Sequence, residues 1–122
     1  MNKRKQIIVL LVLTLLITMS LNAETYPLIM AAGDYKEEYI GNLPAAIEDA
    51  KAVKEALVEH GIVPVKNITY FENPSRIDID IELEDLIKRG SEDDRLIFYF
   101  GGHSEVGENE NGKEDTFLCG VD

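Results

Sequence analysis

The sequence predicts an α/β fold built on a mainly parallel sheet. Short apolar runs alternate along the chain with segments whose apolar residues recur every three or four positions, as in strand–helix–strand proteins. One run, Leu96–Phe100, has five consecutive apolar or aromatic residues, which is typical of a central parallel strand buried on both faces. The length of 122 residues allows one small domain at most.

The first half of the predicted domain is a strand followed by a helix. Residues 26–32 (YPLIMAA) form a short apolar run closed by Gly33-Asp34, which predicts a buried strand. Pro44 begins a helix, because proline favours the first turn, and His60-Gly61 ends it. The apolar residues at helical spacing form one stripe: Ala46, Ile47, Ala50, Val53, Ala56 and Leu57.

The second half repeats this order. Residues 67–71 (NITYF) predict a strand. The isoleucines of residues 77–81 alternate as in a strand, but Ser75 followed by Asp78 resembles a helix N-cap, so we favour a helix over residues 76–88. After the strand at Leu96–Phe100, a polar loop is expected to run to Asp115, and residues 116–119 predict a short final strand.

Residues 1–23 are typical of a secretory signal and residues 24–122 of the mature domain. Lys3-Arg4-Lys5 precedes a mostly apolar stretch over residues 7–21, and Ala23 offers a small residue for cleavage. The apolar stretch is about 15 residues long, short of the roughly 20 that span a bilayer. We therefore expect an exported protein, secreted or periplasmic, with an uncleaved membrane anchor as the alternative.

Composition excludes several classes of function. The net charge is −11, and an acidic surface repels phosphate, so no nucleic acid is expected as a partner. The single cysteine, Cys119, rules out an internal disulfide, and the two histidines, His60 and His103, have no partner at metal-ligand spacing. No metal or cofactor is expected. The acidic stretch over residues 105–115 lacks the pattern of a calcium loop and is expected to be solvated.

His103 is the candidate catalytic residue. It follows a buried strand and two glycines, at the edge where functional residues of parallel sheets gather. Histidine titrates near neutrality and suits proton transfer. On this pattern alone, a histidine that merely caps the strand end remains an alternative.

Four segments together resemble caspase-like cysteine peptidases (clan CD), a group that includes caspases, metacaspases and bacterial relatives. LIFYFGGHS resembles the block that carries the catalytic histidine of that group. YPLIMAAGDY resembles its first strand, with the following turn ending in Tyr35. NLPAAIEDAKAVKEALVEHGI resembles its first helix, with the recurring Asp-Ala pair at Asp49-Ala50, and EDTFLCGVD resembles the strand ending in aspartate.

The resemblance implies a three-layer α-β-α fold with a mainly parallel sheet and a protein or peptide substrate. His103 would be the acid/base partner of a cysteine thiolate. Ser104 replaces the glycine whose backbone N–H helps to form the oxyanion hole, and it keeps the N–H but tolerates fewer backbone angles. Asp49 matches the acidic position that selects Arg or Lys at P1, with a solvent-facing residue early in the helix as the alternative.

The resemblance also predicts that the nucleophile is missing. In caspases the cysteine follows the histidine by about 50 residues, and Cys119 stands at a structural position of the group. We therefore expect an incomplete domain, truncated before the catalytic cysteine and inactive alone. The alternatives are a non-catalytic caspase-like module that binds or regulates partners, and an unrelated exported α/β binding domain in which His103 is incidental.

Overall fold

The computed structural model describes residues 2–3, 5–8, 10–11 and 23–122. Most of the predicted export segment, including residues 12–22, lies outside the described residues. Within the described ranges, no helix has both the length and the apolar character needed to cross a membrane.

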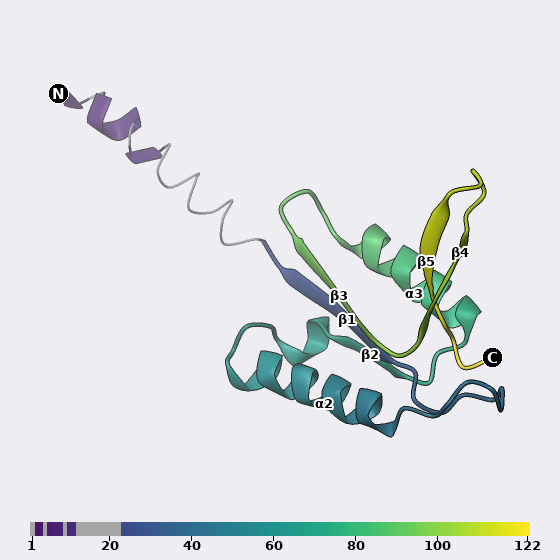
Figure 1. The fold of residues 1–122 in the computed structure, drawn as a ribbon. Coiled ribbons are helices and arrows are strands. Elements are labelled where there is room, and N and C mark those ends of the chain that lie inside the picture. Colours follow the sequence, from purple (N-terminus) through teal and green to yellow (C-terminus); the bar gives the residue numbers. More distant parts are fainter. Residues whose placement is uncertain (1, 4, 9, 12–22) are drawn as a thin grey trace.

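The domain is mixed α/β, and its centre is a parallel sheet of three strands (Figure 1). The strands are β1 (Thr25–Ala31), β2 (Thr69–Glu72) and β3 (Arg95–Gly101), in the order β2-β1-β3. A 3₁₀ turn, η1 (Val65–Asn67), precedes β2. The prediction of a parallel sheet with alternating strands and helices is confirmed.

Two helices cover opposite faces of this sheet (Figure 1). Side chains alternate along a strand, so Leu28 and Met30 of β1 face α3 (Arg76–Arg89), whereas Ile29 faces α2 (Pro44–Glu59). Residues 28–31 are at most 1% exposed. β1 therefore forms the core of the domain, and both of its faces are covered.

The helix boundaries follow the sequence signals. Pro44 begins α2, and the chain leaves the helix at His60, just before Gly61 at φ +62°. Ser75 caps α3 in a full capping box, because its side chain accepts from the Asp78 N–H while Asp78 accepts from the Ser75 N–H. The preference for a helix over residues 76–88 is confirmed.

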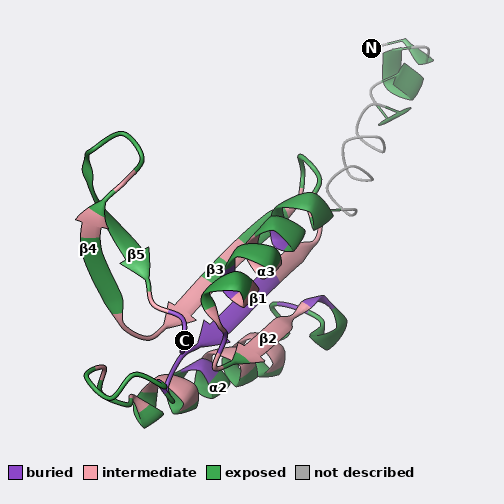
Figure 2. Cartoon of the chain, turned by 90° about the vertical axis from the view of Figure 1, so that its right-hand side faces the viewer, coloured by how far each residue is buried: buried purple, intermediate pink, exposed green. Residues whose placement is uncertain are grey.

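The predicted central position of the Leu96–Phe100 strand is wrong. β3 lies at the edge of the sheet, and β1 is the central strand (Figure 2). Leu96 and Phe98 are 40% and 39% exposed. A continuous apolar run shows that a strand has apolar surface on both faces, but it does not show whether both of its edges are paired.

The predicted loop over residues 101–115 is also wrong in part. β4 (Ser104–Glu108) and β5 (Glu114–Leu118) form an antiparallel hairpin that projects from the end of β3 (Figure 2). Asn109 organises the turn by accepting hydrogen bonds from the N–H groups of Asn111 and Lys113, and Gly112 supplies a φ of +68°. Asn111-Gly112 is a known hairpin signal, and it could have predicted this turn.

Candidate functional site

His103 follows β3 directly, at the carboxyl edge of the sheet. This is the placement that the sequence predicted. Gly102 is required before it, since a Cβ atom there would lie 2.8 Å from both the Tyr35 hydroxyl and the Phe100 ring. The glycine thus lets the chain turn closely around Tyr35, and His103 stays half-buried.

The Tyr35 hydroxyl bridges the start of the hairpin. It accepts a hydrogen bond from the His103 N–H at 2.8 Å and donates one to the Cys119 carbonyl at 3.4 Å. The reciprocal bond is direct, from the Cys119 N–H to the His103 carbonyl at 3.0 Å. His103 and Cys119 therefore form a hydrogen-bonded pair that continues the β4–β5 ladder, with a hydroxyl inserted into one of its two bonds.

The imidazole of His103 is held by the loop between β1 and α2. Its Nε2 lies 2.8 Å from the Gly41 carbonyl oxygen, and its ring centroid lies 5.0 Å from that of Tyr35. A carbonyl only accepts hydrogen bonds, so Nε2 must carry the proton. In the neutral ring this leaves Nδ1 as the basic nitrogen, available to a reacting group.

The loop over residues 34–42 is tied together at its ends. The Asn42 side chain accepts from the Tyr35 N–H at 2.9 Å and donates to the Asp34 carboxylate at 3.4 Å. Asn73, at φ +51°, accepts from the N–H groups of Gly33 and Asp34, both at 3.0 Å. The two groups that hold His103, from Tyr35 and Gly41, therefore sit on a closed loop.

Ser104 is the exposed first residue of β4. Its φ is not positive, since Asn73 is the one non-glycine residue with positive φ among the described residues. Because His103 and Cys119 form a hydrogen-bonded pair, the next pair, Ser104 and Leu118, is a non-hydrogen-bonded one. The Ser104 N–H therefore points away from β5, in a direction from which a ligand could approach it.

Asp49 is exposed on α2, about one helical turn after Ala46, which lies against the end of β3. The Ala46 carbonyl oxygen is 3.4 Å from the Cβ position of Gly101. The Asp49 carboxylate makes no hydrogen bond or ion pair within the described part of the chain. The structure therefore joins Tyr35, Gly41, His103 and Cys119 through hydrogen bonds, and within the described residues no hydrogen bond or ion pair joins Asp49 to them.

Cys119 is half-buried, and its thiol is free. Burial raises the pKa of this thiol, and the negative charge of Glu105 raises it further. The thiolate is the nucleophilic form, so this environment is the opposite of an activating one. The geometry therefore supports a structural role for Cys119, as its place in the sequence suggested.

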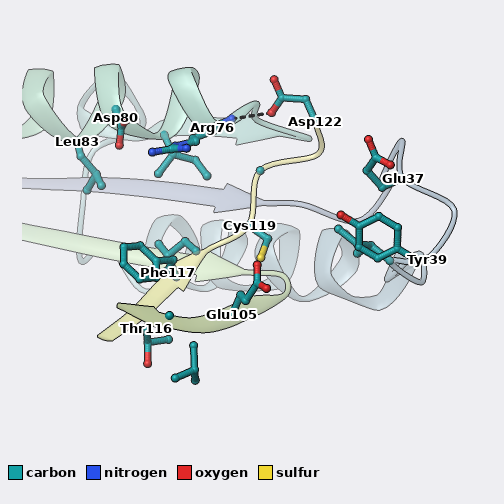
Figure 3. Close-up of a pocket in the computed structure, with 16 residues that line it drawn as sticks. Glu37, Tyr39, Arg76, Asp80, Leu83, Glu105, Thr116, Phe117, Cys119 and Asp122 are labelled. Atoms are coloured by element: carbon teal, nitrogen blue, oxygen red, sulfur yellow. Dashed lines mark hydrogen bonds between the residues drawn. The ribbon is translucent and has the colours of Figure 1, made fainter. Parts of the chain in front are cut away.

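An open groove of about 780 Å³ lies between α3 and the hairpin (Figure 3). Sequence reasoning missed it, because the hairpin was expected to be a loop. Apolar side chains from both sides line it, including Leu83 of α3 and Phe117 of β5. Its charged lining residues are four carboxylates and one guanidinium: Glu37, Asp80, Glu105, Asp122 and Arg76.

No three or more His, Cys, Asp or Glu side chains come together as a metal site in the described ranges. No protein-family model matches the chain, and no curated protein is significantly similar to it. The role of each site residue is therefore argued from geometry and chemistry.

Proposed function

We propose that this chain carries the histidine half of a caspase-like cysteine endopeptidase site. The observation that carries the proposal is the setting of His103. The imidazole stands at the carboxyl edge of a parallel sheet, with Nε2 fixed on the Gly41 carbonyl and Nδ1 left basic. A histidine that only capped a strand end would need neither a fixed ring orientation nor a free basic nitrogen.

In the proposed reaction a cysteine thiolate attacks the peptide carbonyl and forms an acyl-enzyme. His103 protonates the leaving amine and later takes a proton from the water that hydrolyses the acyl group. The free N–H of Ser104 donates to the oxyanion. The thiolate comes from polypeptide outside these 122 residues, since Cys119 is the one cysteine in the sequence and its pKa is raised.

The fold belongs to the same proposal. Two helices on opposite faces of a parallel sheet support it, because a caspase-like domain would also have helices on both faces of its sheet. Within the described residues the outer edge of β3 pairs with no strand, and this open edge supports the proposal that further strands complete the domain. Export through residues 1–23, or anchoring through residues 7–21, completes the proposal and places the substrate outside the cytoplasm.

The proposed substrate is a protein or peptide with Arg or Lys at P1. Asp49 is the proposed selecting carboxylate, because it is exposed and has no cationic partner of its own within the described residues. Its neighbour in the helix, Ala46, contacts the end of β3 that carries His103.

The test compares two proteins on fluorogenic peptides with Arg or Lys at P1. One is the 122-residue chain, and the other is the product of the reading frame that contains it, extended through its next hydrophobic strand and cysteine. The chain alone should be inactive. The extended product should cleave, and His103→Ala should lower kcat/KM by about 10³-fold or more.

His60→Ala is the matched control, because His60 is exposed at the end of α2 and contacts nothing at the site. Activity of the extended product that survives His103→Ala would end the proposal. Turnover by the chain alone that depends on His103 would show that the nucleophile lies within the 122 residues. Asp49→Asn should raise KM for basic peptides and leave neutral ones unchanged.

A second candidate is a non-catalytic module that binds a partner, and the groove between α3 and the hairpin favours it. The groove is open, partly apolar and lined by carboxylates, so a basic and apolar peptide would fit it. A reading frame that stops after codon 122, together with peptide binding that is unaffected by His103→Ala, would favour this module over the peptidase.

A further inference from the structure

The loop over residues 34–42 touches His103 at two places, once at its backbone and once at its ring. We propose that this loop is a clamp that positions the imidazole, with the Tyr35 hydroxyl and the Asn42 carboxamide as its positioning groups. The effect of the clamp on catalysis rests on the proposed function. Its effect on the orientation of the His103 ring does not.

The Tyr35 hydroxyl fixes where the backbone of His103 lies. It stands between the His103 N–H and the Cys119 carbonyl, two groups that would otherwise bond directly across the ladder. Tyr35 is buried among Ala32 and Val121, with Ile40 and Leu43 packed against them, so its own position is set by apolar contacts. The hairpin therefore starts at the place that the side chain of Tyr35 dictates.

The Gly41 carbonyl fixes how the ring of His103 is turned. Its bond to Nε2 is the one hydrogen bond of this imidazole within the described residues, so ring orientation depends on where Gly41 lies. A residue at the end of an exposed loop is mobile unless something ties it down. Here two residues after Gly41 supply that tie: the Asn42 side chain, and the Leu43 N–H, which donates to the Gly33 carbonyl at 2.8 Å.

The Asn42 side chain links the two residues, Tyr35 and Gly41, through which the loop contacts His103. Its Oδ1 accepts from the backbone of Tyr35, and its Nδ2 reaches Asp34, so the end of the loop is fastened to its beginning. Removing the carboxamide loosens Gly41, because this end of the loop is then tied only by the bond from the Leu43 N–H to the Gly33 carbonyl and by local contacts of Ile40, and it leaves the Tyr35 hydroxyl in place. Removing the hydroxyl breaks the backbone bridge while leaving the tie between Tyr35 and Asn42 intact.

Two variants separate these effects in the full chain. Tyr35→Phe keeps the buried ring and its contact with the imidazole, and it removes only the hydroxyl. Amide exchange of the His103 N–H should then accelerate about fivefold or more, which corresponds to about 1 kcal/mol, the usual net contribution of one hydrogen bond. Asn42→Ala should leave that exchange rate unchanged.

The ring itself is followed by long-range ¹H–¹⁵N correlation of the two imidazoles. Wild-type His103 should show one fixed tautomer with Nε2 protonated, and exposed His60 provides an averaged reference in the same spectrum. In Asn42→Ala and in Tyr35→Phe the His103 ring nitrogens should shift toward the values of His60. Neither variant should move the resonances of β1.

Tyr39→Phe is the matched control, since it removes the same hydroxyl from the same loop at a side chain that is 83% exposed. Tyr39→Phe should change neither the amide exchange rate of the His103 N–H nor the shifts of the His103 ring nitrogens. Unaltered His103 ring shifts in both test variants would overturn the clamp and reduce Tyr35 to a packing residue.

The clamp and the peptidase proposal fail in distinguishable ways. In an active, extended form, Tyr35→Phe should lower kcat with little change in KM, because a misplaced acid/base slows the chemical step more than binding. Ring shifts that move as expected in a protein whose turnover ignores His103 would keep the clamp and discard the peptidase. Turnover that depends on His103, with no shift of the ring nitrogens in either variant, would keep the peptidase proposal and discard the clamp.

Discussion

Cys119 lies opposite His103, and its backbone is fixed by its N–H bond to the His103 carbonyl and by the bond that its carbonyl accepts from the Tyr35 hydroxyl. The proximity of a cysteine and a histidine would by itself suggest a catalytic pair. The environment of the thiol argues otherwise, because burial and the charge of Glu105 both raise its pKa. The distinction matters, since a reactive thiol here would supply the nucleophile of the proposed site from within the 122 residues.

Alkylation of Cys119 by iodoacetamide tests this at neutral pH. We expect a slower reaction than that of a free thiol of ordinary pKa, because less thiolate is present. Glu105→Gln should speed the reaction by removing the second cause of the raised pKa. Glu108→Gln, a charge farther along β4, should have a smaller effect. Alkylation faster than that of a free thiol would contradict the raised pKa and support Cys119 as a nucleophile.

At the scale of the elements, α3 begins at two overlapping caps. Ser75 and Asp78 form the capping box, and the Asp122 carboxylate accepts from the Arg76 N–H at 2.9 Å (Figure 3). Both caps place negative charge at a helix N-terminus, where the helix dipole favours it. The hydrogen bonds from Ser75 lower the pKa of the Asp78 carboxyl below its ordinary value of 3.8.

The capping box should make stability depend on pH at the acidic end. A carboxyl whose pKa is lowered by folding stabilises the fold above its unfolded pKa, and this contribution is lost as the pH falls through the folded value. Asp78→Ala should therefore be less stable than wild type at pH 6, and the difference should shrink below pH 3.8. Urea unfolding at a series of pH values measures it.

Asp80→Ala is the control for this experiment, because it removes a carboxylate from the same helix without removing a cap. Its difference from wild type should not follow the same pH course. A difference for Asp78→Ala that persists unchanged below the unfolded pKa would contradict the assignment of the cap to the ionised carboxylate.

The elements that the sequence predicted correctly are those with local signals. Pro44 and the Ser75–Asp78 cap mark helix starts through interactions within one turn, so no tertiary information is needed. The final strand predicted at residues 116–119 overlaps β5, but β4 was missed because its five residues, SEVGE, contain a single large apolar side chain and no apolar alternation. The turn residues of the hairpin, Asn111-Gly112, were the one available signal.

The position of the site was predictable from the sequence, but the hydrogen bonds that build it were not. The position of His103 follows from its place after an apolar run, which is local information. The hydrogen bonds of Tyr35 and Gly41 with His103 join residues that are 68 and 62 positions apart, and no sequence pattern predicts them. Long-range hydrogen bonds of this kind become visible only once the sheet brings the segments together.

At the scale of the whole molecule, β3 is an exposed edge. The Gly101 carbonyl accepts from the Ala32 N–H, so the alternate residues Leu96, Phe98 and Phe100 direct their N–H and C=O groups away from β1. The outer edge carries no charged residue between Leu96 and Gly101. Edges of this kind lack the charges that natural sheets use to prevent pairing with another chain.

The 122-residue chain should therefore self-associate with rising concentration. Phe98→Lys should weaken this association, because it places a charge on the outer strand. Phe117→Lys is a matched control, since Phe117 is 46% exposed on the hairpin and Phe98 is 39% exposed on the sheet edge. Sedimentation velocity over a range of concentrations checks both. A chain that stays monomeric throughout, or equal effects of the two variants, would contradict the role of the edge.

Residues 119–122 connect parts of the chain that are distant in sequence. Val121 accepts from the Lys36 N–H and donates to the Pro74 carbonyl, and Gly120 passes so close to α3 that a Cβ atom there would collide with the Arg76 nitrogen. During synthesis the histidine and its clamp leave the ribosome before this segment does. These contacts can form only after residues 119–122 have left the ribosome, so the end of the hairpin cannot be fastened to α3 and to the loop of Lys36 before then.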